Sequence, residues 1–536
     1  DLHSLRRRQR QMCIRDRRGT EEGIIINVLE NVRPKVVTYV LDPLSPIFIP
    51  SPYVLEKLMG IPRREKQGVV VGVLSNVDTP LLMQPWESAP KVALKLKSLF
   101  QHVLVVGSTG AGKTSFIKNL IYELVKNHEA SVLSLDSTQE LIQMLFPNRP
   151  EALREEISLR EILYRINSDK IEKVIVLLPL TNKYIKDNKI QGLRELGEKY
   201  WEDVLQPLAK LHNLKIEKPH IKEHIEESNK TPPEIEIKIH DDISCTVIPY
   251  AIDLKPDPEN IEKLGIKLMQ LNPFFTERVR TIIPRVFKEL KEGLARCQNL
   301  DEIGEKIREK RRSLEQRLGI RPAMMDNLLY NIFAMAEWGI FNVKIGGVEI
   351  KEVSPEYFIK KATLTVVDLY VIEKMECQNA LVLYLLDQVF KWKRRMRKEG
   401  RNTPPTFVVI DEAHNRFPQR GLGRAEGEEF TKLVASKLTK IAREGRKERL
   451  GLILSTQFPR DVHGAVRSLC NTKIVFRVDK NDVEVLDIPA EYRHLVTSMD
   501  DLTALVMSPV GLRFGYVFIK VPLPITEHVD LSAMVG

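Results

Sequence analysis

The sequence predicts an α/β fold in which a parallel sheet is preceded by a β-rich segment and interrupted by a helical insertion. Short apolar runs such as Val103–Val106 and Phe407–Ile410 lead into glycine-rich or acidic segments, as buried parallel strands do. Between these runs lies a long charged stretch with helical periodicity. A chain of 536 residues is also too long for a single core, so several domains are expected.

The composition is that of an ordinary globular protein, with 43% hydrophobic and 29% charged residues. No apolar run approaches the roughly 18 residues that a membrane span needs, so no membrane association is expected. The five cysteines are scattered and form no C-x-x-C pair, which favours a reducing, cytoplasmic location.

Residues 1–20 are predicted to be a non-native or disordered tail. They hold seven arginines and two aspartates without periodicity, and RRQRQMCIRD at 7–16 resembles one translated frame of a sequencing adapter. A basic nucleic-acid-binding arm and a targeting segment are the alternatives. Without these residues the formal charge falls from +10 to +5, with 75 basic against 70 acidic residues. Basicity alone therefore does not establish a nucleic-acid partner.

The remaining chain divides into five segments. Residues 21–90 contain short strands separated by turns, which is typical of a small β-barrel or sandwich, and we expect a barrel. Residues 91–185 begin the α/β core with a strand, a glycine loop, a helix and further apolar strands. Residues 186–360 are predicted to form a helical insertion, because they are charged and largely helical in period. Residues 361–510 complete the core, and the proline-bearing residues 511–536 are expected to form a C-terminal brace.

A phosphate-binding loop follows the strand at Val103–Val106. The loop fits G-x-x-x-x-G-K-[ST] and opens an amphipathic helix, which is the context this motif requires. Glycines let backbone N–H groups point at phosphate oxygens, while Lys113 supplies a charge to the β/γ-phosphates and Thr114 a hydroxyl to Mg²⁺. The predicted cofactors are ATP and Mg²⁺, and the predicted nucleotide-binding residues are Gly107, Ser108, Thr109, Gly110, Ala111, Gly112, Lys113, Thr114 and Ser115.

Acidic and amide side chains follow two later strands. Asp411 ends a strand where a phosphate-loop enzyme holds Mg²⁺, and Glu412 is placed to polarise the attacking water. Gln457 ends the strand LILST, which we expect beside the strand that carries Asp411. From this position Gln457 would contact the γ-phosphate or the attacking water. This combination predicts a RecA-like P-loop nucleotide triphosphatase (NTPase) core that hydrolyses ATP.

Two basic segments have competing interpretations. Arg443 and Arg446 lie three residues apart on one helical face, either to neutralise transition-state charge on a neighbouring subunit or to form a surface ion-pair cluster with Glu444 and Glu448. The basic run at 391–397 either touches a phosphate backbone or is a solvated helix end favoured by the helix dipole.

The segments GSTGAGKTS, VVIDEAHNRFP, IAREGRK and GLILSTQFP, in this order, resemble the HerA family of DNA translocases within the HerA/FtsK group of ring ATPases. The resemblance covers about residues 23–530, with specific motifs only in the ATPase core, and the β-rich segment is similar to the family's barrel. The chain departs from the family at 136–140, where DSTQE replaces a stretch similar to DPHGEY.

The resemblance implies an ATP-driven homo-hexamer that translocates or unwinds double-stranded DNA. It also implies a NurA-like nuclease partner in end resection and recombinational repair. A nucleotide-switched ring scaffold that recruits a nuclease is one alternative. A conjugation- or packaging-type DNA pump is another, although a conjugation-type protein would be expected to carry a membrane span.

A glycine-containing segment, RFPQRGLGRAEGEEF, follows the acidic pair. Arg416, Arg420 and Arg424 lie in it, and we predict that they line the pore of the ring and hold DNA phosphates without reading sequence. An ordinary surface loop is the alternative.

Overall fold

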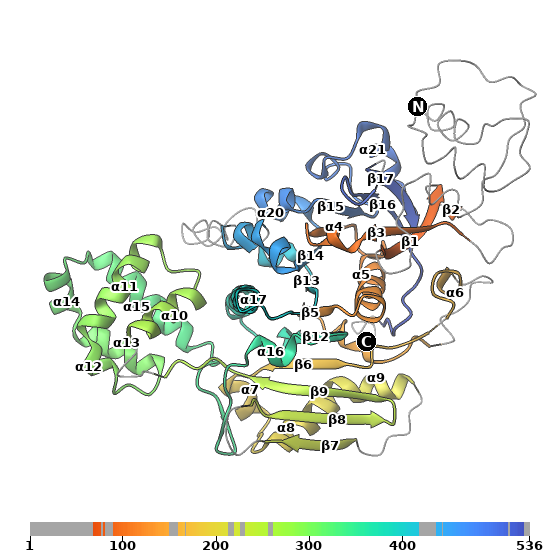
Figure 1. Ribbon diagram of the computed structural model, residues 1–536. Coiled ribbons are helices and arrows are strands. Elements are labelled where there is room, and N and C mark those ends of the chain that lie inside the picture. Colours follow the sequence, from red (N-terminus) through yellow and green to blue (C-terminus); the bar gives the residue numbers. More distant parts are fainter. Residues whose placement is uncertain are drawn as a thin grey trace, which may run out of the picture.

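Eight parallel strands form the centre of a fifteen-stranded sheet in the computed structural model (Figure 1). The structure describes residues 68–76, 79–80, 89–149, 159–166, 168–212, 219–225, 231–255, 261–417, 436–441, 443–512 and 515–529. In spatial order the parallel strands are β15 (Thr472–Val475), β4 (Val103–Val106), β14 (Leu450–Thr456), β13 (Thr406–Ile410), β5 (Ser131–Asp136), β12 (Thr363–Asp368), β6 (Val174–Pro179) and β9 (Ile243–Tyr250).

The apolar runs in the sequence become these strands because helices and loops cover both sheet faces. Every residue of β4, β13 and β14 is buried, as expected for a parallel sheet whose two faces are both covered. The strand that carries Gln457 at its end, β14, lies directly between β4 and β13. The predicted neighbourhood of these strands is confirmed, and the sheet is the mostly parallel one expected of a RecA-like core.

Antiparallel strands extend the sheet on both sides. Beyond β15 the order is β16 (Thr503–Met507), β17 (Tyr516–Lys520), β1 (Gly68–Asn76) and β2 (Thr79–Pro80), with β3 (Lys91–Lys95) also paired to β1. Most of the predicted N-terminal barrel, residues 21–67, lies outside the described residues. The described strands β1 and β3 join the main sheet through β17.

On the other side, β8 (Glu234–His240) and β7 (His220–His224) follow β9. The prediction that residues 186–360 are helical is therefore wrong for the three strands at 220–224, 234–240 and 243–250. The segment EIEIKIH alternates buried and half-buried residues along β8, so its period is two and its charges lie on one face.

Helices α10 to α15 form a separate cluster that projects to one side of the sheet (Figure 1). Their apolar faces meet around buried residues such as Phe287, Ile303 and Leu328. Their bounds are α10 (Ile261–Leu271), α11 (Glu277–Glu289), α12 (Lys291–Leu294), α13 (Leu300–Glu309), α14 (Arg311–Leu318) and α15 (Pro322–Ala336).

Two helices in the core position the residues discussed below. Helix α5 (Lys113–Tyr122) follows the phosphate-binding loop, and α17 (Met375–Lys398) precedes β13. Among the described helices, none combines the length and apolar character that crossing a membrane requires. The shorter elements are α4 (Leu96–Leu99), α6 (Leu159–Tyr164), α7 (Asn182–Asp187), α8 (Leu193–Tyr200), α9 (Gln206–Leu211), β10 (Lys344–Ile345), β11 (Val348–Glu349), α16 (Pro355–Phe358), α18 (Ala413–Arg416), α20 (Gly464–Leu469) and α21 (Ala490–Val496).

The last described residues, 521–529, form an extended segment that we call the C-terminal strap. Side chains from the first half of the core donate hydrogen bonds to its carbonyl oxygens. Lys118 Nζ lies 2.8 Å from the oxygen of Glu527, and Asn119 Nδ2 lies 2.7 Å from that of Pro522. The strap thereby ties the end of the chain to the helix that follows the phosphate-binding loop.

Candidate nucleotide site

The phosphate-binding loop connects β4 to α5 at the carboxyl edge of the sheet. Gly110 and Gly112 adopt φ values of 76° and 109°, in the region that side chains disfavour, which explains glycine at both positions. Lys113 begins the helix and folds back over the loop, with its Nζ 3.0 Å from the carbonyl oxygen of Ser108. The hydroxyl of Ser108 is buried and has no hydrogen-bond partner among the described residues. The loop therefore offers both a cation and an unpaired donor at the position expected for phosphate.

The charges of three carboxylates act on the Lys113 amine. Burial lowers the pKa of Lys113, and the charges of Glu412, Asp411 and Glu140 oppose that effect. Burial also raises the pKa of Asp411, with a further contribution from Glu412. A phosphate-bound metal ion would stabilise carboxylates that otherwise repel one another.

The structure links the loop to Glu412 through Gln457. Thr109 Oγ1 donates to Gln457 Oε1 at 2.7 Å, and Gln457 Nε2 donates to Glu412 Oε1 at 3.0 Å. Glu412 itself has φ +46°, an uncommon conformation for a non-glycine residue that turns the chain sharply after β13. The three side chains come from three neighbouring strands, so a change at the loop can be passed to Glu412.

His414 belongs to the same group and was not singled out from the sequence. Its Nδ1 lies 3.1 Å from Glu412 Oε2 and also 3.1 Å from Thr456 Oγ1. The ring packs edge-on against Phe458. Although burial acts to raise the pKa of Glu412, the contact with His414 contributes to a pKa below the usual range. The side chain of Glu412 is therefore held as a carboxylate.

The oxygen atoms near the loop fit Mg²⁺. Thr114 lies in the first turn of α5 and hydrogen-bonds to Glu140, while Asp411 lies at the end of β13. Hydroxyl and carboxylate oxygens are the ligands that Mg²⁺ prefers, together with waters and substrate phosphates. Within the described ranges, no group of three or more His, Cys, Asp or Glu residues is arranged to hold a metal on its own. Thr114 and Asp411 would thus share the ion with the nucleotide.

Arg443 and Arg446 do not reach this group. Both are exposed and precede β14, at the amino edge of the sheet, whereas the loop lies at the carboxyl edge. The expected ion pairs with Glu444 and Glu448 are also absent among the described residues, because those carboxylates pair with Arg394 and Arg397 of α17. The two arginines are left available to another molecule.

The proposed DNA contact at Arg416 needs correction. Arg416 is 4% exposed, and its guanidinium donates to Asn379 Oδ1 at 2.7 Å and to Gln378 Oε1 at 2.9 Å. It therefore holds α18 against the start of α17 and is not presented to solvent. Arg420 and Arg424 lie outside the described residues.

Comparisons with known proteins give three kinds of match. A family model for the central domain of the helicase HerA matches residues 83–339. The probable helicase MJ1565 of Methanocaldococcus jannaschii is 29% identical over 132 residues, which cover 24% of this chain and 22% of that protein. The matched part is thus about a fifth of the relative's length.

Two solved structures match most of the chain at low identity. VirB4 of Thermoanaerobacter pseudethanolicus has a TM-score of 0.42 at 13% identity, covering 88% of this chain and 99% of its own. The bacterial conjugative coupling protein TrwB, in a crystal form with sulphate, has a TM-score of 0.45 at 14% identity, covering 90% and 93%.

Proposed function

We propose that this chain is a HerA-type ATPase that couples ATP hydrolysis to movement along double-stranded DNA, a proposal supported by the match of residues 83–339 to the model of the HerA helicase central domain. The observation that carries the proposal is the connected contact from Thr109 through Gln457 to Glu412. It joins a phosphate-binding loop to an ionised carboxylate, and this arrangement suits hydrolysis better than binding alone.

Each residue of the site would have one task. The backbone N–H groups of residues 107–112 and the amine of Lys113 hold the phosphates. Thr114 and Asp411 hold Mg²⁺, which when bound neutralises phosphate charge. Glu412 accepts a hydrogen bond from the attacking water and orients it, with a typical contribution of about 10²- to 10⁴-fold for such a group. Gln457 would sense the γ-phosphate through Thr109.

The test is a pair of substitutions in the full-length chain. Lys113→Ala should weaken ATP binding, because it removes the charge that the phosphates face. Glu412→Gln should preserve binding and abolish turnover, because the amide keeps the shape but cannot accept a proton. Binding is measured with a fluorescent ATP analogue and turnover by phosphate release, each with and without duplex DNA. Near-normal turnover of Glu412→Gln would exclude its assignment as the base.

Duplex DNA should raise the ATPase rate of the wild-type chain. A rate that does not respond to DNA would favour the alternative, a nucleotide-switched ring scaffold that recruits a nuclease. A NurA-like partner, end resection and recombinational repair are the parts of the proposal that rest on the family resemblance, whereas a cytoplasmic location rests on the scattered cysteines.

We further propose that the chain acts as a head-to-tail hexamer in which Arg443 or Arg446 completes the neighbour's site. Both arginines are exposed and distant from their own loop, so a second subunit must bring them to a nucleotide. Mixed rings of Glu412→Gln and Arg443→Ala/Arg446→Ala subunits should recover hydrolysis that neither ring has alone. Rings that remain inactive after verified subunit exchange would contradict the shared site.

A further inference from the structure

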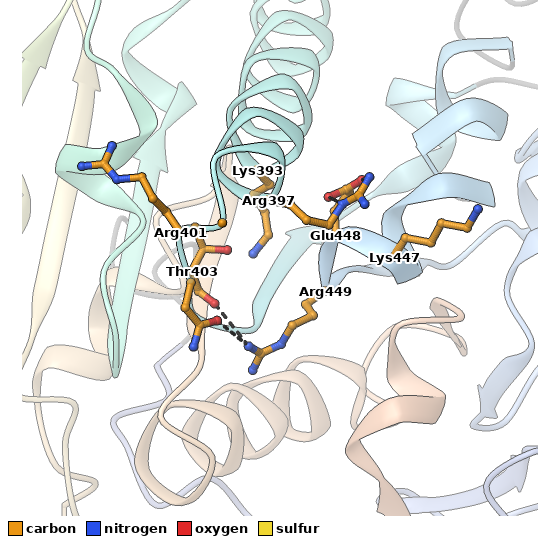
Figure 2. Close-up of a pocket in the computed structure, with 9 residues that line it drawn as sticks. Lys393, Arg397, Arg401, Thr403, Lys447, Glu448 and Arg449 are labelled. Carbon is orange, nitrogen blue, oxygen red and sulfur yellow. Dashed lines mark hydrogen bonds and ion pairs between the residues drawn. The ribbon is translucent and has the colours of Figure 1, made fainter.

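A basic pocket lies at the amino edge of the sheet, opposite to the nucleotide site (Figure 2). It is formed by the end of α17, the connection at 399–405 that leads into β13, and the turn at 446–449 that leads into β14. The hollow has a volume of about 320 Å³, enough for a phosphate group. Five cations and one carboxylate are the charged side chains that line it: Lys393, Arg397, Arg401, Lys447, Arg449 and Glu448.

Most of this positive charge is not neutralised by protein. Glu448 is buried and is engaged by Arg397, whose Nε and Nη2 lie 2.7 and 2.9 Å from its two oxygens. In the part of the chain that the structure describes, no carboxylate forms an ion pair with Lys393, Lys447 or Arg449. The pocket therefore has a net positive charge.

Lys393 gives the pocket a buried cation. It is 1% exposed, and its Nζ donates to the oxygen of Pro404 and to Thr406 Oγ1, both at 2.8 Å. An ammonium group has three N–H donors, so one remains for a ligand. Burial, with a contribution from Arg449, lowers the pKa of Lys393 to about 7. A bound anion would offset the free-energy cost of burying a charged Lys393 beside Arg449.

The arrangement of the side chains separates the centre of the pocket from its rim. Figure 2 shows Lys393 and Arg449 extending toward the middle of the group, while Arg401 and Lys447 extend outward on opposite sides. Arg449 is held by Asn402 Oδ1 and the oxygen of Thr403, at 3.2 and 3.4 Å. The centre is thus positioned by protein contacts, whereas the rim cations can follow a larger ligand.

Stabilisation of the helix end does not account for this cluster. The dipole of α17 favours cations in its last turn, where Arg395, Arg397 and Lys398 lie. It does not explain the buried Lys393 or the cations of the 446–449 turn. Residues 391–401 and 447–449, which leave out the two arginines assigned to the neighbouring nucleotide site, hold nine Lys and Arg against two Glu, so the basic surface extends beyond one phosphate.

We propose that this pocket binds a backbone phosphate of duplex DNA, without regard to sequence, as an accessory contact on the face away from the nucleotide. Lys393 and Arg449 would hold the phosphate, and Arg401 and Lys447 would approach the flanking phosphates. Cations at this spacing recognise the regular charge of the backbone and carry no base readout. The inference rests on DNA as the substrate in the proposed function.

The experiment measures binding of a labelled duplex to the full-length chain with Mg-ADP saturating, over a series of salt concentrations. The pocket variant is Lys393→Gln/Arg449→Asn, because asparagine tolerates the φ of +52° at position 449. The rim variant Arg401→Gln/Lys447→Gln changes only exposed residues and leaves the fold intact. The matched control, Lys183→Gln/Lys361→Gln, removes the same charge from exposed residues on other elements.

The pocket variant should lower affinity on the order of tenfold and reduce the slope of log K against log salt by about 1 to 2, the change expected for one or two lost phosphate contacts. The rim variant should change both quantities in the same direction, and the control should leave the slope unaltered. A second measurement adds inorganic phosphate, again with Mg-ADP saturating so that the phosphate-binding loop is occupied, and records the thermal midpoint. Phosphate should raise the midpoint of the wild type and not that of the pocket variant.

The outcomes separate this inference from the proposed function. If the wild type binds duplex and the pocket and rim variants keep its affinity and slope, the pocket assignment is overturned and the proposed function stands. If phosphate acts through the pocket but duplex binding is indifferent to it, the pocket holds a free anion and the DNA assignment is overturned. If the wild type binds no duplex at all, both the pocket assignment and the proposed function are contradicted.

Discussion

Replacing Asp368 with asparagine should stabilise the protein at alkaline but not at acidic pH. Asp368 ends β12 beside Asp136, its register partner at the end of β5. Burial, with a contribution from Asp136, raises the pKa of Asp368 to about 7. A carboxyl group whose folded pKa exceeds its unfolded value of about 4 contributes stability at low pH, which is lost as pH rises through 7. The gap of about three units corresponds to about 4 kcal/mol.

Asparagine has the same shape and carries no charge. Its Oδ1 can still accept from the Tyr370 N–H, now 3.1 Å away, and the Gln139 amide can rotate to accept from the new NH₂ group. The hydrogen bonds that favour the ionised form already act on the raised pKa of Asp368, so they are not subtracted a second time. We therefore expect a stabilisation of about 4 kcal/mol near pH 8 that falls to almost none near pH 4.

The assay is the thermal midpoint of full-length wild type and Asp368→Asn across this pH range. The matched control is Asp136→Asn. Asp136 accepts three hydrogen bonds, from the N–H groups of Thr138 and Leu141 and from the Thr138 hydroxyl, so the amide should destabilise the protein at every pH. Equal destabilisation by Asp368→Asn at both ends of the range would refute the burial argument.

Three further predictions concern other parts of the chain. His414→Ala should lower turnover and spare ATP binding. It should also move the acid limb of the pH profile of kcat/KM to higher pH, because a contact that lowers the pKa of Glu412 is lost. An acid limb at an unchanged pH would contradict this role. Arg416→Ala should lower the thermal midpoint, since two buried acceptors lose their donor at a cost of about 1 to 3 kcal/mol each. The salt dependence of DNA binding should stay unchanged. A changed salt dependence would support the original prediction that Arg416 contacts DNA. Deleting residues 1–20 should leave assembly and DNA-stimulated ATPase activity unaltered, whereas a large loss of DNA affinity would indicate a basic arm.

The parts of the fold that follow from local pattern could be predicted from the sequence. The strands β4, β13 and β14 are continuous apolar runs, and the glycine loop fits a known phosphate-binding motif, so the placement of β14 beside β13 could be predicted. The strand β8 was missed although its isoleucines recur at every second residue, because the charged residues that alternate with them dominate the composition of the segment.

Site residues that belong to a local motif could be predicted from the sequence. Residues whose burial depends on contacts with distant segments could not. Lys113 and Glu412 lie in motifs, and the structure brings both to one edge of the sheet. Arg416 follows the acidic pair closely enough to look like a loop residue. Only its distant contacts with α17, at 378 and 379, show that it is buried.

The position of β4 also bears on how the protein is made. Both of its partners, β14 and β15, come from beyond residue 449, and two side chains of the following helix need the strap at 522 and 527. During translation the strand would therefore leave the ribosome hundreds of residues before its neighbours, and its pairing is of the non-local kind that forms slowly. A fragment that stops at residue 339 would contain the glycine loop but would leave both edges of β4 unpaired. Unpaired strand edges promote aggregation. The segment that matches the HerA model therefore lacks both strands that pair with its own β4, and these strands come from residues 450–456 and 472–475.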